Sequence, residues 1–407
     1  MVVGEEIAPI YRGSVKDVYA SGENLLFHFS DDFSVFDWGK MPDRIEGKGR
    51  SLALFAASVF EQLDGKLFAD LPNSRHLKHF DSKFLQDLFG GDLYKKELAV
   101  NGMSSHYRGL NWGGRLGKVS QYLEAFRSGE TDSEPLYLEV DKALVQRPEL
   151  RQIGGESVYF YPAAENAPLR FIPLEIVFRF GVPQGSSLLS RLAHDPALPA
   201  RLGLSLPSSE IKAGVVFDRP VIEFFTKLES SDRLLSYQEA SLISGLSATA
   251  FHRLYQTAQF VSLALYHLFA EAGGQNLHLL DGKVEAAYRQ ADGAIVLADS
   301  VGPDELRLSY NGVQLSKEAL RLYYRQTDWF NKIEAAKKEV RPHGVTWQKV
   351  MKERGDKPPA LPADLKETMA CMYKSLALGL VGIDEAEKQS RFSLPSLSAI
   401  ASKLEKL

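Results

Sequence analysis

The sequence predicts a protein of mixed α and β structure with a β-rich first lobe. Residues 8–37 alternate apolar and polar side chains around two turn-forming pairs, as expected of strands that bury one face. Further strand-like runs at 169–180 and 215–225 alternate with helical patterns. The 407 residues, 44% of them hydrophobic, can bury a large core, so we expect two or three packed lobes.

Helices are expected where an apolar face repeats at helical spacing. The first covers 51–63, with Ser51 as its cap, after the short motif Gly47-Lys48-Gly49-Arg50. Further helices are expected over the ranges 236–244, 247–272, 316–326 and 364–378. A proline-rich stretch at 357–362 should form a stiff extended spacer before the last helix.

These patterns divide the chain into four segments. Residues 1–72 form a β-rich N-terminal lobe, 73–168 an enlarged middle segment, 169–310 a central lobe, and 311–407 a C-terminal helical region. Glycine pairs interrupt short helix-like and strand-like stretches in the middle segment, so we expect it to elaborate a core formed by the rest.

Composition excludes several classes of protein. The net charge of −4 gives no general attraction to nucleic acid or to an anionic membrane. The single cysteine, Cys371, cannot form an intramolecular disulfide or a cysteine-based zinc site, which suits a reducing cytoplasm. The N-terminus has no basic region followed by an apolar run, and no apolar stretch reaches about 18 residues. We therefore expect a cytoplasmic protein without nucleic-acid or membrane partners.

The most informative stretch of the chain is a predicted hairpin. Two apolar β-type runs, 276–280 and 294–298, each lead into an acidic patch. Glu285 and Asp299 should then lie on paired strands, where two carboxylates can hold a hard cation such as Mg²⁺. Lys283 faces the same side of its strand as Glu285, where its charge can meet a phosphate. The alternative is a solvated hairpin with an ordinary surface charge pattern.

Two patterns near the start of the chain suggest further site residues. Gly13 and Lys16 lie at an expected turn between strands, where backbone amides and a cation can cover nucleotide phosphates. The same pattern also fits a plain hairpin. Ser34 and Asp37 follow the next apolar run and are candidates either for contact with a substrate or for turn and cap positions.

Charged residues also interrupt two later strand patterns. Glu175 and Arg179 lie within an apolar run, and charged residues are seldom buried without partners. Arg179 can grip a phosphate or carboxylate through two hydrogen bonds, and Ser186 and Ser187 can donate to the same anion. The alternative for Arg179 is an internal ion pair with Glu175. Lys227 stands at another strand end, either in a site or as surface charge.

In their order along the chain, these motifs resemble the SAICAR synthase (phosphoribosylaminoimidazole-succinocarboxamide synthase) family. The matching stretches are 13–19, 34–37, 47–50, 173–179 with 185–187, 226–227, 281–285, 299, 303–307, 316–323 with 329, and 358–362. Their shared order is more specific than any one motif. The resemblance covers nearly the whole chain except the middle segment, which is longer than the family's usual link.

The resemblance implies an α+β fold with a β-rich N-terminal nucleotide lobe, a central mixed lobe and packed C-terminal helices. It also implies an ATP-dependent amide ligase of de novo purine biosynthesis. In that family ATP phosphorylates the carboxylate of carboxyaminoimidazole ribonucleotide, and the amine of L-aspartate attacks the acyl phosphate to give SAICAR, ADP and phosphate. This chemistry needs charge neutralisation and close positioning of three reactants, but no covalent enzyme nucleophile.

Site residues follow from the resemblance motif by motif. It implies that Mg²⁺ is bound by Glu285 and Asp299, and that ATP is contacted by Gly13, Lys16 and Lys283 with Glu175 in support. The implied contacts with the ribonucleotide substrate are Arg179, Ser186, Ser187 and Arg307. The implied residues of the reaction centre are Lys227, Ser34 and Asp37. The implied partners are small molecules, namely ATP, carboxyaminoimidazole ribonucleotide and L-aspartate, and a homo-oligomer is compatible with them.

Four positions depart from the family pattern. They are Ser14 in place of a lysine, Asp32 in place of a common arginine, Ser231 in place of a histidine, and Ala286 in place of an aromatic residue. Arg12 or Lys40 could restore the cationic charge lost near phosphate. The departures leave two alternatives open, a paralogous ATP-dependent ligase that joins a different carboxylate and amine, or a catalytically inactive nucleotide-binding regulator.

Overall fold

The computed structural model describes residues 8–129, 135–183, 185–273, 276–340 and 346–406. The chain forms two compact units, each built from segments far apart in the sequence. Unit 1 comprises Met1–Ser58, Gly109–Val140 and Ser309–Leu407, and unit 2 comprises Val59–Arg108 and Asp141–Leu308. The expected lack of a targeting segment rests on residues 1–7, which lie outside the described residues.

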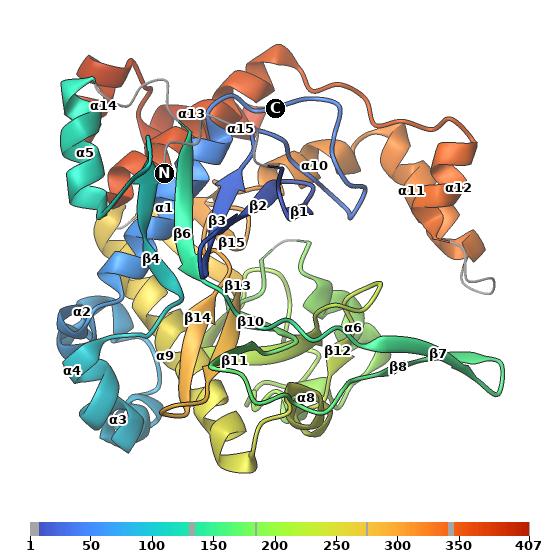
Figure 1. Cartoon of the computed structure of the whole chain (residues 1–407). Coiled ribbons are helices and arrows are strands. Elements are labelled where there is room, and N and C mark those ends of the chain that lie inside the picture. The colour runs from blue at the N-terminus through green and yellow to red at the C-terminus, as the bar shows by residue number, and fades with distance from the viewer. Residues whose placement is uncertain (1–7, 130–134, 184, 274–275, 341–345, 407) are drawn as a thin grey trace. The chain divides into compact units, whose positions relative to one another are not determined.

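Unit 1 contains a six-stranded sheet in the order β1-β2-β3-β6-β4-β5 (Figure 1). Its strands are β1 (Tyr11–Arg12), β2 (Lys16–Ser21), β3 (Asn24–Phe29), β4 (Tyr107–Trp112), β5 (Arg115–Gly117) and β6 (Leu136–Asp141). The tight turn from β2 to β3 places Gly22 at φ +60°, a conformation that costs glycine little because it has no Cβ. The β-rich start is confirmed, and the middle segment supplies the other half of the same sheet.

The helices of unit 1 come from all three of its segments. They are α1 (Lys48–Gln62), α5 (Val119–Ser128), α10 (Glu318–Arg325), α11 (Asp328–Val340), α12 (Trp347–Glu353), α13 (Ala363–Leu380), α14 (Glu385–Phe392) and α15 (Leu397–Lys406). Helix α1 begins before the predicted Ser51, because the Asp31 carboxylate accepts hydrogen bonds from the amides of Gly47 and Gly49. Sequence patterns predicted α1, α10 and α13 but missed α11, α12, α14 and α15.

Unit 2 is organised around a larger sheet in which β12, β11, β10, β13 and β15 are successive neighbours. Its strands are β9 (Leu169–Phe171), β10 (Leu174–Gly181), β11 (Val216–Thr226), β12 (Leu234–Leu235), β13 (Leu277–Arg289), β14 (Ala294–Ala298) and β15 (Leu306–Tyr310), and β16 (Val313–Gln314) pairs with β15. The predicted hairpin is present as β13 and β14. Strand β13 is longer than predicted and continues to Arg289, so the connection is a tight turn.

One face of this sheet is apolar and packs against the long helix α9 (Ala248–Ala272), seen in yellow behind the strands in Figure 1. Phe180 of β10 lies 4.7 Å from Tyr266 of α9, measured between ring centres. Phe224 of β11 lies 5.2 Å from Phe251 of the same helix. Because side chains alternate along a strand, the intervening residues of β10 and β11 point to the opposite face.

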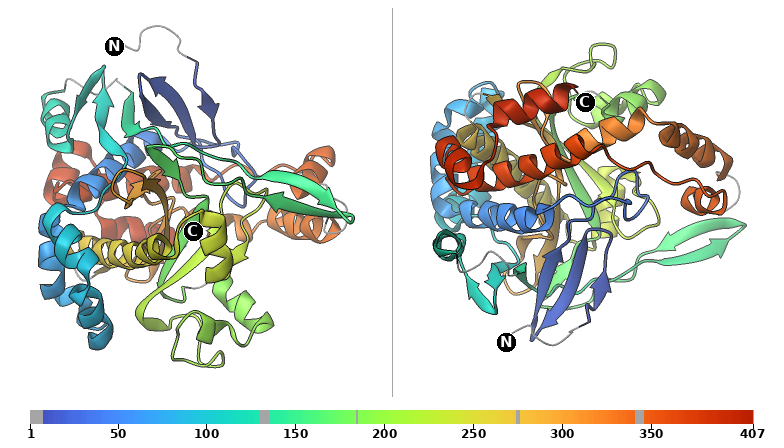
Figure 2. Two further views of the ribbon diagram at one scale, coloured as in Figure 1. Left: turned by 60° about the horizontal axis from the view of Figure 1, so that its bottom comes forward. Right: turned by 90° about the horizontal axis from the view of Figure 1, so that it is seen from above.

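The remaining helices of unit 2 are short. They are α2 (Gly65–Asp70), α3 (Ser82–Gly90), α4 (Ala99–Asn101), α6 (Ser187–His194), α7 (Leu198–Arg201) and α8 (Tyr237–Ser244), with single turns at Leu71–Asn73, Arg75–Leu77 and Tyr94–Leu98. Strands β7 (Glu149–Ile153) and β8 (Glu156–Phe160) form a two-stranded ribbon that extends away from the other strands of the unit (Figure 2). None of the described helices combines the length and apolar character that crossing a membrane requires.

Candidate active site

The face of the unit 2 sheet opposite α9 carries charged side chains from three adjacent strands. Arg179 of β10 lies opposite Asp281 of β13, and Val177 lies opposite both Glu223 of β11 and Lys283 of β13. Residues two apart on a strand share a face, so this register gathers one set of charged residues. The set, called the charged face below, comprises Glu175, Arg179, Glu223, Asp281, Lys283 and Glu285.

Lys227, just past the end of β11, bridges two carboxylates of the charged face. Its Nζ lies 2.7 Å from Oε1 of Glu175 and 2.8 Å from Oε1 of Glu285. The Nζ of Lys283 lies 2.7 Å from the same oxygen of Glu175. Burial alone would lower the pKa of Lys227, but the charges of Glu285 and Glu175 outweigh burial and raise it. Lys227 therefore keeps its positive charge at neutral pH.

Glu285 and Asp299 form the acidic end of the same network. Glu285 pairs with Ala298 of β14, and Asp299 is the next residue along the chain. Burial raises the pKa of the Glu285 carboxyl, and the negative charge of Asp299 raises it further. A bound cation would relieve both effects, because it favours the ionised form of each carboxylate.

These two carboxylates fit Mg²⁺ with a nucleotide. Among the described residues there is no group of three or more His, Cys, Asp or Glu that could hold a metal alone. Mg²⁺, however, is often held by one or two carboxylates and completes its octahedral shell with water and substrate phosphates. Glu285 and Asp299 would therefore hold the ion only when phosphates are close by.

Arg179 is held in the interior between two carboxylates. Its Nε lies 2.5 Å from Oε2 of Glu223, and its Nη1 lies 2.9 Å from Oδ2 of Asp281. Arg307 of β15 reaches the same Oδ2 of Asp281 at 3.2 Å. The expected alternative, an ion pair of Arg179 with Glu175, is wrong, because the two lysines engage Glu175 and Arg179 finds partners on the neighbouring strands.

Helix α6 begins at the predicted serines and reaches this arginine network through Arg191. Ser186 caps the helix, and its Oγ accepts a hydrogen bond from the amide of Leu188 at 3.3 Å, while Ser187 is exposed. Arg191, one turn further along α6, contacts Oε1 of Glu223 at 2.5 Å. Sequence reasoning missed Arg191, although its spacing of four from Ser187 places both on one side of a helix.

Gly13 and Lys16 lie in unit 1, where they form a tight turn. The amide of Gly13 donates to the carbonyl of Lys16 at 2.9 Å. A Cβ at Gly13 would lie 2.6 Å from that oxygen, so the turn requires glycine. The Nζ of Lys16 lies 4.2 Å from the centre of the Phe27 ring. Contact of this turn with nucleotide phosphates stays a prediction.

Ser34 and Asp37 also belong to unit 1 and lie in the loop after β3. Phe36 and Asp37 have φ values of +53° and +59°, a left-handed conformation that is unusual for residues other than glycine. Gln348 of α12 donates to the carbonyl of Asp37 at 3.0 Å. The loop is therefore held in a defined, strained shape, as expected of a segment that presents functional groups.

Asp32, one of the departures from the family pattern, is neutralised within unit 1. The Nζ of Lys40 lies 2.7 Å from Oδ2 of Asp32, and Arg44 lies 3.5 Å from the other oxygen. Burial would raise the pKa of Asp32, but the hydrogen bond from Lys40 lowers it overall. Lys40 thus offsets the negative charge that Asp32 introduces.

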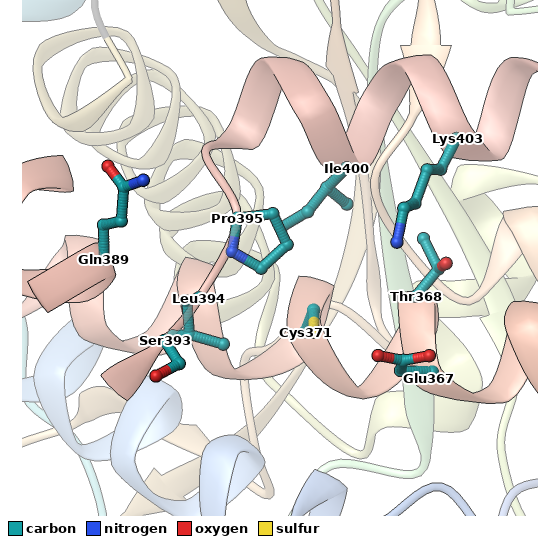
Figure 3. A pocket seen from close by; sticks show the side chains of 9 residues that line it. All are labelled: Glu367, Thr368, Cys371, Gln389, Ser393, Leu394, Pro395, Ile400 and Lys403. Atoms are coloured by element: carbon teal, nitrogen blue, oxygen red, sulfur yellow. The ribbon is translucent and has the colours of Figure 1, made fainter. Parts of the chain in front are cut away.

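The single cysteine has none of the properties of a catalytic nucleophile. Cys371 of α13 lines a cavity of about 450 Å³ together with Glu367 and Lys403 (Figure 3). Burial raises the pKa of its thiol, and the charge of Glu367 raises it further. A thiol with a raised pKa forms little of the reactive thiolate at neutral pH.

Paired lysines and carboxylates with arginines alongside suit an enzyme that neutralises phosphate charge during group transfer. A model of the SAICAR synthetase family matches residues 9–83 and 164–337. The chain belongs to the SAICAR synthetase family. This is the family that the order of the sequence motifs indicated.

Individual relatives agree with this assignment. The chain is 31% identical over 402 residues to a protein of Archaeoglobus fulgidus with the provisional name phosphoribosylaminoimidazole-succinocarboxamide synthase, covering 97% of this chain and 99% of that one. It is 26% identical over 381 residues to the synthase of that name from Thermoplasma acidophilum, covering 92% and 98%. A structure of the Saccharomyces cerevisiae SAICAR-synthase complexed with SAICAR matches with a TM-score of 0.51, 17% identity and coverage of 93% and 96%. The expected α+β fold is confirmed.

Proposed function

We propose that this chain joins carboxyaminoimidazole ribonucleotide and L-aspartate in an ATP-dependent reaction that releases SAICAR, ADP and phosphate. The observation that carries the proposal is the match to phosphoribosylaminoimidazole-succinocarboxamide synthases along nearly the full chain. The expected ligase of purine biosynthesis is thereby confirmed. Neither of the alternatives, a paralogous ligase and an inactive regulator, is favoured.

The charged face supports the nucleotide part of this reaction. Lys283 of the charged face and Lys16 of the β1–β2 turn would contact the phosphates of ATP, and Gly13 would let backbone amides approach them. Glu175 holds both Lys283 and Lys227 at 2.7 Å, so it would fix their positions before substrate arrives. Mg²⁺ bound by Glu285 and Asp299 would neutralise charge on the transferred phosphoryl group.

The arginines would hold the phosphorylated ribonucleotide. The side chain of Arg307 is 18% exposed and that of Arg179 only 5%, so Arg307 is the better placed of the two for direct contact. Arg179 would mainly hold Asp281, which orients Arg307. The helix end at Ser186 and Ser187 would add amide and hydroxyl donors to a phosphate, since the partial positive charge of a helix N-terminus attracts anions.

The amide-forming step needs positioning more than acid–base chemistry. The carboxylate of the ribonucleotide attacks the terminal phosphorus of ATP and displaces ADP, and the neutral amine of L-aspartate then attacks the acyl phosphate and displaces phosphate. Lys227 would stabilise negative charge during the transfer, and Ser34 and Asp37 would line the reaction centre, where the Asp37 carboxylate would accept the proton that the amine loses. A cytoplasmic location and a homo-oligomeric state stay predictions.

The test is ADP release measured with all three substrates and with each of them omitted. The proposal expects turnover that requires both carboxyaminoimidazole ribonucleotide and L-aspartate, with SAICAR identified as the product by mass spectrometry. ATP turnover with a different carboxylate or amine, but none with this pair, would establish the paralogous ligase instead. ATP binding without any turnover would establish the inactive regulator.

A further inference from the structure

The middle segment contacts the ends of two strands that carry the candidate site. The family model leaves a gap between residues 83 and 164, so these contacts lie outside the part of the chain that it matches. Each strand end holds a residue other than glycine in the left-handed region, Asp299 at φ +62° after β14 and Leu228 at φ +76° after β11. Such residues keep this conformation only when their surroundings enforce it.

The first contact is made beside β14. The amide of Leu297 donates to the carbonyl of Ser104 at 2.9 Å, and the amide of His106 donates to the carbonyl of Leu297 at 2.9 Å. The Nε2 of His106 then donates to the carbonyl of Asp299 at 3.0 Å. His106 is 3% exposed and its ring lies edge-on to Phe60, with 6.0 Å between the ring centres. His106 therefore fixes the backbone of a proposed Mg²⁺ ligand.

The second contact is made at the turn after Lys227. The hydroxyl of Tyr161 donates to Oε1 of Glu229 at 2.8 Å, and the amide of Ser230 donates to the hydroxyl of Tyr159 at 2.9 Å. Burial and then the hydrogen bond to Glu229 raise the pKa of Tyr161, so its hydroxyl keeps the proton that it donates. The strained turn that begins directly after Lys227 is thus tied to the end of β8.

We infer that the middle segment positions the site, with His106 holding Asp299 and the pair Tyr159 and Tyr161 holding the turn after Lys227. These are positioning residues, since they act on the main chain next to the groups proposed to meet Mg²⁺ and phosphate. The inference rests on the proposed function for the roles of Asp299 and Lys227. Groups that orient metal ligands in this way change metal affinity by about 10-fold to 100-fold when they are removed.

The test compares variants that remove one hydrogen bond each. His106→Phe keeps a ring beside Phe60 but removes the donor, and His106→Gln keeps a side-chain donor. Tyr161→Phe removes only a hydroxyl. Tyr94→Phe is the matched control, because the Tyr94 hydroxyl donates to the carbonyl of Phe68 at 3.1 Å elsewhere in unit 2. Binding of Mn²⁺ in the presence of ATP is followed by electron paramagnetic resonance, which requires no turnover.

His106→Phe should weaken Mn²⁺ binding about 10-fold, with part of the loss restored in His106→Gln. Tyr161→Phe should lower kcat about 10-fold at unchanged Mn²⁺ affinity. The control Tyr94→Phe should lower the melting temperature by a similar amount, but it should change Mn²⁺ affinity and kcat less than the two site variants do. Wild-type Mn²⁺ affinity in His106→Phe, or a kcat in Tyr161→Phe equal to that of the control, would overturn the inference. If the proposed function itself were wrong, Glu285→Gln would leave Mn²⁺ binding unchanged. That result distinguishes failure of the proposed function from failure of this inference.

A separate observation concerns a larger cavity in unit 1. It has a volume of about 880 Å³ and is lined by residues of α1, α5, α13 and α14. Each of these helices contributes one cation, namely Arg50, Arg127, Lys374 and Arg391 in that order. Among the described residues that line the cavity, Glu46 is the single acidic one. The buried side chains of Leu54 and Leu378 contribute to an apolar floor. This positive excess stands out in a chain with a net charge of −4.

For three of these cations, Arg127, Lys374 and Arg391, the contacts with described residues balance the positive charge only weakly. Arg127 and Arg391 share one oxygen of Glu387, at 3.5 Å and 4.0 Å. The Nζ of Lys374 lies over the ring of Phe392, at 5.3 Å from its centre. Ion pairs this long and this exposed contribute little energy, so an anion between the helices could draw the three cations to itself.

We propose that this cavity binds a nucleotide-sized organic phosphate, with its phosphate at the cationic rim and its apolar part on the floor. The volume lies within the range of about 300–1,000 Å³ that is typical of small-molecule sites. Guanidinium groups from separate helices suit a phosphate, because their planar donors match its oxygens. Nothing in the proposed reaction requires this site, so it would bind a ligand in addition to the substrates.

The single cysteine provides a local probe, because Cys371 lines the cavity and no other thiol is present. Alkylation of Cys371 by iodoacetamide is timed by mass spectrometry with AMP, adenosine or inorganic phosphate added. AMP should slow alkylation at least about five-fold in a saturable way, since bound ligand excludes the reagent. Lys374→Gln and Arg391→Gln should abolish this protection, while Lys406→Gln, the same change at an exposed lysine outside the lining, should retain it.

Protection by inorganic phosphate as well as AMP would also support the proposal and show that the cationic rim alone suffices. Equal protection by adenosine would overturn it, because adenosine carries no charge. So would protection that survives in both cavity variants, since a ligand bound elsewhere would then cause it. Absence of protection by every compound would overturn it as well. Circular dichroism of each variant verifies that the fold is intact.

Discussion

The Nζ of Lys227 lies 2.8 Å from Oε1 of Glu285, the carboxylate proposed to bind Mg²⁺. The ammonium group of Lys227 and a metal ion would compete for the same carboxylate. Binding of Mg²⁺ with ATP should therefore loosen Lys227 from Glu285 and leave it held by Glu175 alone, at 2.7 Å. The lysine would then be available to the phosphate that the ion brings with it.

Replacement of Lys227 should separate metal binding from catalysis. Lys227→Met removes a charge that competes for Glu285, so Mn²⁺ should bind equally well or more tightly. The same change removes a positive charge from the transferred phosphoryl group, and kcat should fall about 100-fold. Mn²⁺ binding and kcat are measured on the same preparation, with Lys227→Arg as the charge-conserving control. Weaker Mn²⁺ binding in Lys227→Met would contradict the competition between the two cations.

Replacement of Glu285 should act mainly on the metal requirement. Glu285→Gln keeps the shape of the side chain but removes the charge that attracts Mg²⁺, so the half-saturating Mg²⁺ concentration should rise about 10-fold to 100-fold. Asp292→Asn is a suitable control because Asp292 lies in the turn of the same hairpin, exposed and paired with Arg289. A variant with a normal Mg²⁺ requirement would show that Glu285 is not a ligand.

The two substrate arginines should respond differently to replacement. Arg307→Ala should raise the KM for carboxyaminoimidazole ribonucleotide at least about 10-fold, because a charged hydrogen bond to phosphate is lost, with little change in the KM for ATP. Arg179→Ala should lower the free energy of unfolding by about 3 kcal/mol, because it leaves the buried carboxylates of Glu223 and Asp281 without the arginine that they share.

Steady-state kinetics and denaturant unfolding of both variants measure these effects. Arg289→Ala removes a partly exposed arginine of the same unit that pairs with exposed Asp292, so it should change neither the KM nor the stability appreciably. If Arg307→Ala lost affinity equally for ATP and for the ribonucleotide, the assignment of Arg307 to the ribonucleotide alone would be wrong.

Glu223 should make the stability of the protein sensitive to acid. Burial would raise its pKa, but the charges of Arg179 and Arg191 outweigh burial and lower the pKa in the folded state. A carboxyl whose pKa is lowered by folding stabilises the protein above its unfolded pKa of about 4.3, and this stabilisation disappears as the pH falls through the folded value. Denaturant unfolding should therefore show a loss of stability below about pH 4. Glu223→Gln should reduce the pH dependence in this range, and an unchanged slope would contradict the assignment.

The local arrangement of the charged face could be predicted from the sequence because it depends on alternation along one strand. Asp281, Lys283 and Glu285 lie two positions apart along β13, so any extended conformation places them on one face. Gly13 is similar, since the turn it forms involves a partner only three residues away. The family resemblance added which ligand each of these groups would meet.

Pairing between strands could not be predicted in the same way. Arg179 was expected to act on a substrate or to pair with Glu175, yet its partners Glu223 and Asp281 lie 44 and 102 residues away. Which carboxylate is nearest depends on the register of β10 with its two neighbours, and alternation within one strand contains no information about register.

The middle segment shows the same limit most clearly. Its glycine-rich sequence predicted only elaboration, whereas β4, β5 and β6 complete the sheet of unit 1 and His106 reaches the carbonyl of Asp299, 193 residues further along. Short-range patterns predicted part of the strands, turns and helices, including the β13–β14 hairpin and α9, and motif order indicated the family and its chemistry. The ion-pair partners and the hydrogen bonds that hold the strand ends arise only when distant segments pack together, because hydrogen bonds and ion pairs depend on distance in space.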